Sequence, residues 1–417
     1  MNRIFAAVLV AAMVGGALVG WLCHLYLAPD QAKSVADSLT ILTDIFLRLI
    51  KMIIAPLVFS TLVAGIAHME DAAAIGRVGA KTMGWFISAS IVSLLVGLAM
   101  VHLLHPGSGL SLPLPPVDAA SGISAGDFTL RQFVMHMVPQ SIVQAMAENE
   151  ILQIVVFSVL VGSAVAALDD KAPAVLALVE QIATIMLKVT GFVMKTAPVA
   201  IFAALASTVA TQGPSVLVTY AGFVGSFYLS LGVLWFLLFL AARFVVGRKA
   251  VPLFRGIREP ALLAFSTASS EAAYPKTMEV LQEQGVKKRI VSFVLPLGYS
   301  FNLDGSMMYC TFATLFIAQA YHIQLTLGQQ ITMLFLLMIT SKGMAGVPRA
   351  SLVVISATLT YFHLPEAGLL LILAVDHLLD MGRSATNVIG NSVAASVIDK
   401  WESGRGDEPE DAPAPAA

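Results

Sequence analysis

Long apolar runs constrain the fold of this 417-residue chain more than any other feature of its sequence. A helix needs about 18 to 20 mostly apolar residues to cross the hydrocarbon core of a bilayer. Such runs occur at residues 4–28, 38–69, 79–104, 130–168, 171–208 and 215–245, and the fourth is expected to be broken. The chain is 58% hydrophobic and 12% charged, whereas soluble domains carry about 25% charged residues. We therefore predict an all-α integral membrane protein, in which residues 4–28 are the first span and not a cleaved leader.

Polar clusters interrupt the apolar segments in the second half of the chain. They lie at residues 266–275, 302–306 and 341–351. Backbone can leave its helical hydrogen bonds at membrane depth only where protein or a water-filled cavity satisfies it. These interruptions indicate discontinuous helices or re-entrant hairpins, which are candidate binding elements.

Lysine and arginine indicate the sidedness of the chain, because cytoplasmic loops collect them and outer loops do not. The basic residues expected inside are Arg3, Arg77, Lys81, those from Arg243 to Arg258, Lys276, those from Lys287 to Arg289, and Lys400. Residues 106–127 include no basic residue and are expected outside. Basic flanks at both ends of residues 259–286 predict a hairpin that enters and leaves on one side. Both termini are then cytoplasmic, and the polar tail 402–417 is expected to be disordered.

A stripe of polar residues lies inside the last apolar segment. Asp380, Arg383, Ser384 and Asn387 stand at i, i+3, i+4 and i+7, on one face of a helix. A charged side chain at mid-bilayer costs roughly 2.5 to 3.5 kcal/mol on insertion scales, so the stripe implies a polar cavity or a compensating partner. Arg383 can grip a carboxylate through two parallel hydrogen bonds, while Asp380 can hold an ammonium group or neutralise Arg383 in an empty site. The stripe suits a zwitterionic anion.

Five motifs, in order along nearly the whole chain, resemble the dicarboxylate and amino acid to cation symporter family. This family includes the excitatory amino acid transporters and bacterial glutamate and C4-dicarboxylate carriers. The motifs are LRLIKMIIAPLVFSTLVAGIA at 47–67, TASSEAAYP at 267–275, GYSFNLDGS at 298–306, SKGMAGVP at 341–348 and DHLLDMGRSATNVIGN at 376–391. The resemblance implies eight transmembrane helices plus two opposed re-entrant helical hairpins, a homotrimer, and a transport domain that moves like an elevator against a fixed scaffold.

The same resemblance divides the chain into scaffold and transport domain. Scaffold helices are expected at residues 1–75 and 129–208. The transport domain would comprise the third helix with its outer loop at 76–128, the sixth helix at 209–255, the first hairpin at 256–286, the seventh helix with its NLDG break at 287–322, the second hairpin at 323–362 and the eighth helix at 363–401. Residues 402–417 form the tail.

The family pattern also implies the substrate site, with the two hairpin tips acting as gates. Substrate would contact Ser269, Ser270, Ser306, Gly346, Val347, Asp380, Arg383, Ser384 and Asn387. In the family, an aspartate matching Asp380 binds the amino group of the substrate, and an arginine matching Arg383 binds its side-chain carboxylate. The dicarboxylate branch usually lacks that aspartate. We therefore predict a symporter that imports L-glutamate or L-aspartate, with a C4-dicarboxylate:cation symporter as the alternative.

The coupling ion is predicted in the same way, and no cofactor is expected besides it. Its candidate ligands are Ser90, Gly298, Ser300, Asn302, Asp304, Ser341, Asn387 and Asn391. Asn391 stands where sodium-driven relatives have an aspartate, and Phe86 and Ala89 stand where they place tyrosine and threonine oxygens. These departures resemble the proton-linked bacterial glutamate carriers and favour H+ over Na+, which is the alternative. Glu271 is the candidate proton carrier, because desolvation in an apolar hairpin tip favours a protonated carboxyl group.

Other classes of protein fit the sequence less well. Cys23 and Cys310 lack metal-ligand spacing, and no patch for nucleic acid is present. A serine intramembrane protease would need a serine with a general base or a GxSxG elbow, and neither is found. A ligand-gated anion channel has no need of gates on both sides of one site. The prediction is a multi-pass transporter in the bacterial inner membrane, whose partners are a small acidic substrate, lipid and its own copies.

Overall fold

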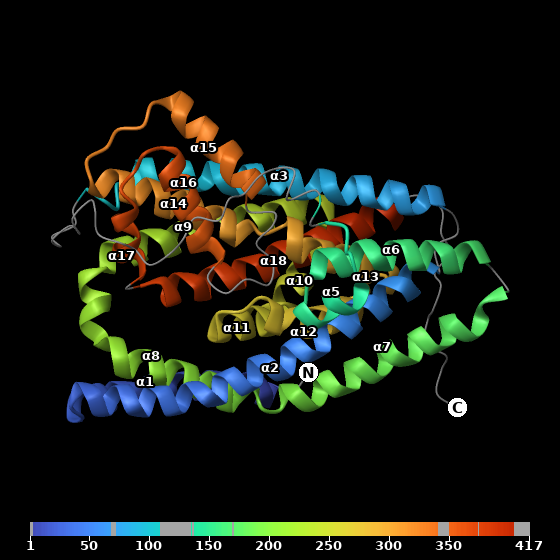
Figure 1. Cartoon of the computed structure of the whole chain (residues 1–417), viewed down its shortest axis with the longest axis horizontal. Coiled ribbons are helices and arrows are strands. Elements are labelled where there is room, and N and C mark those ends of the chain that lie inside the picture. Colours follow the sequence, from blue (N-terminus) through green and yellow to red (C-terminus); the bar gives the residue numbers. More distant parts are fainter. Residues whose placement is uncertain are drawn as a thin grey trace.

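The computed structural model of the chain describes residues 3–67, 72–108, 135, 137–168, 171–340, 350–373 and 375–403, and most of these residues lie in helices. Many of the long helices run along the longest axis of the molecule (Figure 1). The first half forms α1 (Arg3–Tyr26), α2 (Pro29–Ala67), α3 (Ala72–Leu104), α5 (Ile142–Glu148), α6 (Ile151–Leu168), α7 (Pro173–Met194), α8 (Ala197–Thr219) and α9 (Ala221–Val245). The second half forms η2 (Gly247–Lys249), α10 (Ala250–Gly256), α11 (Arg258–Thr267), η3 (Glu271–Ala273), α12 (Tyr274–Glu283), α13 (Lys288–Phe301), α14 (Asp304–Ala320), α15 (Leu327–Thr340), α16 (Ala350–Tyr361), η5 (Glu366–Gly368), α17 (Leu369–Leu373) and α18 (Asp376–Ser403).

Several helices have the length and composition of membrane spans. Among the described residues, five are long and apolar enough to cross a bilayer: Pro29–Ala67, Ile75–Leu104, Ile151–Leu168, Pro173–Met194 and Ala221–Val245. Large apolar side chains such as Leu95, Leu178 and Phe236 are exposed on these helices. A surface of this kind is suited to lipid and not to water. The predicted all-α, multi-pass membrane architecture is therefore confirmed at this level.

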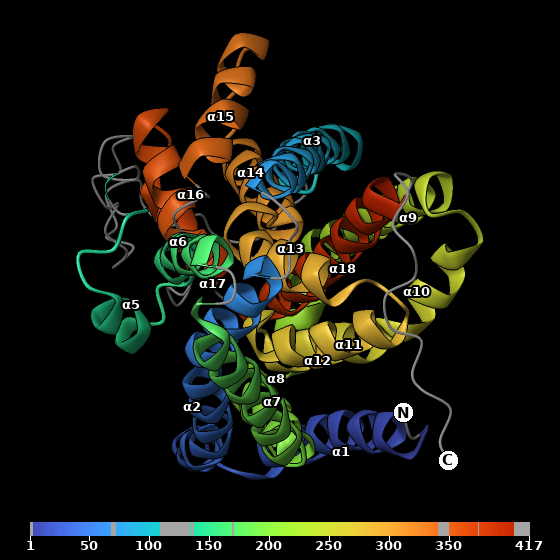
Figure 2. The same cartoon turned by 90° about the vertical axis from the view of Figure 1, so that its right-hand side faces the viewer.

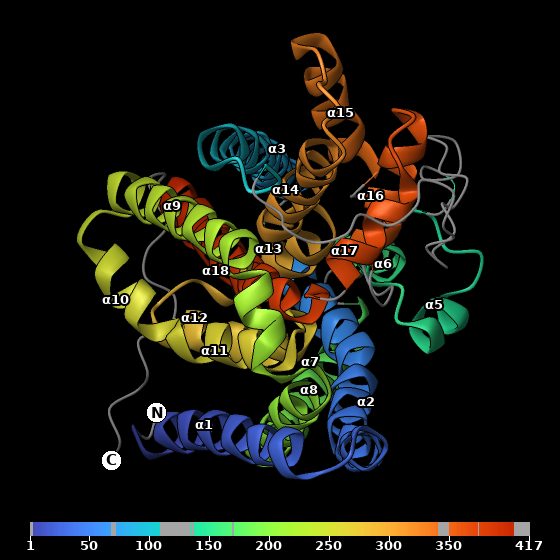
Figure 3. The ribbon, with the colours of Figure 1, turned by 90° about the vertical axis from the view of Figure 1, so that its left-hand side faces the viewer.

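The helices form two groups that pack against each other. In the first group α1 lies along α8, and α2 contacts α6, α7 and α8. In the second group α18 is enclosed by α9, α11, α13 and α14, while α3 packs on α14. Figures 2 and 3 show α1, α2, α7 and α8 on one side of the molecule and α18 within the other group. Most of α18 from Ser384 to Ile398 is buried, so its polar residues lie inside the protein.

Breaks between helices follow local sequence signals. Asn149 adopts a left-handed conformation, with φ of 55°, and separates α5 from α6, as expected for the fourth apolar run. The run at 171–208, by contrast, is not one helix, because α7 ends at Met194 and α8 begins at Ala197. Pro198 explains this difference, since proline fits the first turn of a helix but not its interior.

Two further breaks carry the candidate site. Asn302 and Leu303 leave the helical conformation between α13 and α14, which places the predicted NLDG break in the protein interior. Ala268, with φ of 48°, ends α11 and begins the turn through η3 into α12. Residues 256–286 therefore contain two helices, α11 and α12, joined by a turn.

Candidate functional site

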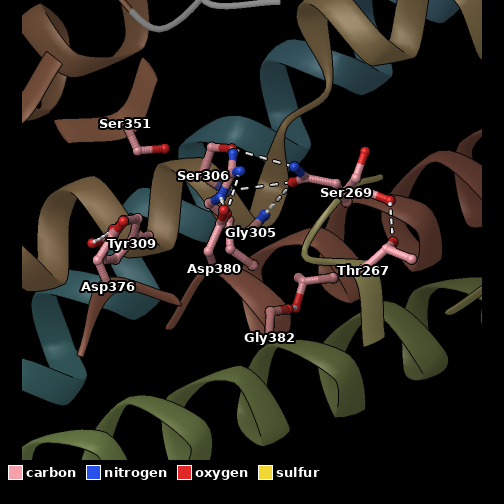
Figure 4. Close-up of polar contacts among 12 residues, drawn as sticks. Thr267, Ser269, Gly305, Ser306, Tyr309, Ser351, Asp376, Asp380 and Gly382 are labelled. Atoms are coloured by element: carbon pink, nitrogen blue, oxygen red, sulfur yellow. Dashed lines mark hydrogen bonds and ion pairs between the residues drawn. The ribbon is translucent and has the colours of Figure 1, made fainter. Parts of the chain in front are cut away.

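The predicted stripe on α18 meets the beginning of α14. The guanidinium of Arg383 forms an ion pair with Asp380, and its Nε donates a hydrogen bond to Asp380 Oδ1. Arg383 Nη1 donates to Ser306 Oγ at 3.0 Å. The side chains of Arg383 and Asp380 are 19% and 22% exposed, so neither is completely enclosed. Figure 4 shows Asp380 beside Ser306 and Gly305.

Asn387 fixes the beginning of α14 to α18. Its Oδ1 accepts hydrogen bonds from the backbone N–H of Gly305 at 2.8 Å and of Ser306 at 3.4 Å. Its Nδ2 donates to Ser306 Oγ at 3.3 Å. The first N–H groups of a helix have no partner within the helix and carry partial positive charge. Asn387 satisfies two of them, and Ser306 becomes the point on which Asn387 and Arg383 converge.

Close approach of the backbones makes these contacts possible. A Cβ atom added at Gly305 would overlap the carbonyl group of Arg383, and one added at Gly390 would overlap the carboxylate of Asp304. Glycine is therefore required at both positions for the present spacing of α14 and α18.

A second polar cluster lies deeper, around the NLDG break. Asn302 Nδ2 donates to Asp304 Oδ2 at 3.2 Å and to Asn391 Oδ1 at 3.1 Å, while Ser93 Oγ donates to Asp304 Oδ1 at 3.1 Å. All four side chains are fully buried. Asn302 Oδ1 and Ser300 Oγ have no hydrogen-bond partner among the described residues.

This cluster brings together four of the eight predicted coupling-ion residues: Asn302, Asp304, Asn391 and Gly298, which lies against Asn391. Its oxygens are of the kind that hard cations prefer. Among the described residues the carboxylate of this cluster is that of Asp304, and each of its two oxygens accepts a hydrogen bond. Asn391 Nδ2, a buried donor, has no partner in the described part of the chain. Ser90 is buried on α3, three residues before Ser93. Ser341 lies outside the described residues.

The turn between α11 and α12 carries Ser269 and Ser270, and Figure 4 shows Ser269 at the edge of the site. Ser269 Oγ accepts from Ala272 N–H at 3.3 Å, and the Ser270 carbonyl accepts from Tyr299 OH at 3.0 Å. In Figure 4, Ser269 and Thr267 lie on one side of Asp380 and Ser306, and Tyr309 and Asp376 lie on the other. Ser384 is buried, with no hydrogen-bond partner for its Oγ among the described residues. Gly346 and Val347 lie outside the described residues.

Glu271 occupies a different environment from the stripe. It lines a narrow cavity with Ile54 and Val58 of α2, Ile151 of α6, Tyr274 of α12, and Pro296 and Tyr299 of α13. This cavity faces the first helix group.

Three residues of the two clusters, Tyr309, Asp376 and Ser93, were not expected from the sequence. Tyr309 OH donates to Asp376 Oδ1 at 2.6 Å, and both residues are buried. Asp376 stands four residues before Asp380 and extends the stripe by one turn, a signal available in the sequence. The contribution of Ser93 from α3 depends on packing between helices distant in sequence, and no local pattern indicates it.

Comparison with known proteins decides the family. A family model described as "Sodium:dicarboxylate symporter family" matches residues 5–401. The chain belongs to this family. Two similar proteins are the "C4-dicarboxylate transport protein" of Laribacter hongkongensis, 40% identical over 94% of this chain and 88% of the relative, and that of Rhodospirillum rubrum, 41% identical over 96% and 88%. A "C4-dicarboxylate transport protein 2" of Mesorhizobium japonicum is 39% identical over 96% and 89%.

Membership of the sodium:dicarboxylate symporter family confirms the predicted resemblance and the expectation that the chain is a transporter and not an enzyme. The prediction of L-glutamate or L-aspartate import is wrong, because these relatives are C4-dicarboxylate transport proteins. That prediction depended on Asp380 as a ligand for an ammonium group. In the structure Asp380 is paired with Arg383, which is the other role that the sequence left open.

Proposed function

We propose that this protein imports C4-dicarboxylates in symport with a cation, and that the cation is a proton. The observation that supports this substrate is the partly exposed guanidinium of Arg383, which donates a hydrogen bond to Ser306 at the interior end of α14. Guanidinium binds carboxylates through paired hydrogen bonds. The names of the relatives support a substrate of four carbons with two carboxylates.

Binding follows from the donors that converge on Ser306. One substrate carboxylate would bind the guanidinium of Arg383, with the Ser306 hydroxyl beside it. The N-terminal end of α14 adds the favourable field of the helix dipole for an anion. The second carboxylate would lie toward the turn between α11 and α12, where Ser269 and Ser270 stand.

The architecture that we propose has eight transmembrane helices and two re-entrant hairpins. The hairpins are α11–α12 and α15–α16, and α18 with its enclosing helices moves as the transport domain against a scaffold of α1, α2 and α5 to α8. Separate packing of these two groups supports the division, with the boundaries expected from the sequence. We further propose a homotrimer in the bacterial inner membrane, with both termini in the cytoplasm.

The proton is favoured by the composition of the deep cluster. The family is named for sodium, but in this chain Asn391 supplies an amide instead of a carboxylate. Within the described part of the chain, Asp304 is therefore the single anionic side chain of the cluster, and Ser93 and Asn302 already donate to it. A sodium ion in this cluster would have to displace these hydrogen bonds with little anionic charge to compensate for its lost hydration.

Uptake of labelled succinate by proteoliposomes tests the proposal. We expect accumulation under an inwardly directed proton gradient without sodium, and none under a sodium gradient alone. Unlabelled succinate, fumarate or malate should compete, whereas glutamate should not. Uptake driven only by sodium would contradict the proposed coupling ion but not the proposed substrate. Absence of succinate uptake and of succinate exchange under every gradient would contradict the substrate.

A further inference from the structure

Asp380 lies among charged and phenolic side chains, and its ion-pair partner is Arg383. The residues that face it or its ion pair are Arg383 and Asp376 on α18, Tyr309 and Cys310 on α14, and Tyr228 on α9. Both phenols donate elsewhere, Tyr309 to Asp376 and Tyr228 to the carbonyl of Leu378. Among the described residues, Arg383 is the cation that contacts Asp380.

Each nitrogen of the Arg383 guanidinium already contacts a partner before a substrate binds. Asp380 accepts from the Nε edge of the guanidinium, and Ser306 accepts from Nη1. An arginine grips a carboxylate through two parallel N–H groups. A substrate carboxylate that takes such a pair from the Nε edge must therefore displace Asp380 from Arg383.

Charge balance then acts on the displaced carboxylate. In the empty site, Asp380 and Arg383 sum to zero. A dianionic substrate brings the sum to minus two among the helices that enclose α18, where like charges repel more strongly than in water. A carboxylate that loses its counter-ion and faces a second carboxylate favours its protonated form. One proton on Asp380 reduces both the total charge and this repulsion.

We propose that Asp380 carries the transported proton, binding it from solvent when the substrate takes Arg383 and releasing it when the substrate leaves. This inference rests on the proposed function and specifies how that site couples substrate to proton. The ion pair re-forms in the empty carrier, so the return step moves no unpaired charge through the membrane. The role differs from the one predicted for Glu271, whose cavity faces α2 and α6.

Proton counting during binding tests this role. The heat of fumarate binding to the purified full-length protein is measured at one pH in two buffers of different ionisation enthalpy. Fumarate is chosen because both of its carboxyl groups stay ionised at neutral pH. We expect the wild type to take up close to one proton per fumarate, and its Kd to rise about tenfold per pH unit at alkaline pH. Asp380→Asn should take up close to none, with a Kd that no longer changes with pH.

Two variants separate Asp380 from its rivals. Asp376→Asn removes the neighbouring carboxylate, and Glu271→Gln removes the hairpin carboxylate; both should still take up close to one proton. Retention of that proton in Asp380→Asn, its loss in Glu271→Gln, or fumarate binding to the wild type without proton uptake would overturn the inference. Failure of the wild type to bind fumarate would instead defeat the proposed substrate. If Asp380→Asn does not bind, Asp380→Glu decides: binding with proton uptake supports the role, and binding without it refutes the role.

Discussion

At the scale of the residue, Arg383 should be replaceable neither by alanine nor by lysine. Arg383→Ala removes the one guanidinium that the described residues place at the proposed carboxylate site, and it should abolish succinate uptake. Arg383→Lys keeps the charge but loses the paired N–H donors. A hydrogen bond to a charged group contributes roughly 1.5 to 3 kcal/mol. We expect its KM for succinate to rise about 10- to 100-fold, measured in proteoliposomes.

Arg248→Lys provides the matched control for this substitution. Arg248 is exposed in η2, outside the site, and its replacement should leave the KM unchanged. Immunoblots of membranes should show equal amounts of all three variants. An Arg383→Lys protein with the wild-type KM would show that paired hydrogen bonds do not hold the substrate.

Asn387 should contribute to stability as well as to binding, because its amide oxygen accepts from two backbone N–H groups of α14. Asn387→Ala leaves these donors without their partner, and an unsatisfied buried donor costs about 1 to 3 kcal/mol. We expect a lower Tm for the detergent-purified variant. Ser392→Ala is the control on the same buried helix, since Ser392 Oγ donates only to the carbonyl of Val388 one turn away. Equal Tm values for the two variants would contradict the capping role.

At the scale of the element, the sequence predicts where helices break better than it predicts what the breaks contact. The NLDG break and the turn after Thr267 were both expected from polar residues within apolar segments. The division of residues 171–208 was not, because apolar periodicity continues across Lys195 and Thr196. Partners such as Ser93 for Asp304, or Tyr309 for Asp376, come from helices far apart in the chain. Local patterns place residues on a face, but packing selects the partner.

Contact between α14 and α18 should depend on Gly305. Gly305→Ala introduces a methyl group into the space of the Arg383 carbonyl, so the helices must separate. Overpacking of this kind typically costs about 1 to 3 kcal/mol. We expect this variant to have a lower Tm and a higher Kd for succinate. Gly232→Ala in α9 is the control, because an added Cβ there meets nothing within 4 Å. Its Tm should be equal to or above that of the wild type.

At the scale of the whole molecule, basic residues agree with the arrangement of the helices. Arg77 and Lys81 at the beginning of α3 were assigned to the same side as Lys400 near the end of α18. In the structure Arg77 and Lys81 both form ion pairs with Glu402, so these two ends do lie together. The substrate was predicted wrongly, because an aspartate and an arginine one turn apart fit either a ligand for an ammonium group or an internal ion pair. Geometry and relatives were needed to choose between them.

Sidedness itself can be measured by single-cysteine labelling. In a background of Cys23→Ala and Cys310→Ala, Ser108→Cys places a thiol after α3 on the proposed outer side, and Lys400→Cys places one on the inner side; both native side chains are exposed. A membrane-impermeant maleimide applied to intact cells should label Ser108→Cys at once, and Lys400→Cys only after the membrane is permeabilised, while the cysteine-free background stays unlabelled. Ser108 follows the end of α3, Lys400 lies on α18, and Arg77 and Lys81 at the other end of α3 pair with Glu402 of α18. The reverse pattern would therefore invert the whole transport domain. The hairpin α11–α12 would then open outward, and import coupled to an inward proton gradient would lose its structural basis.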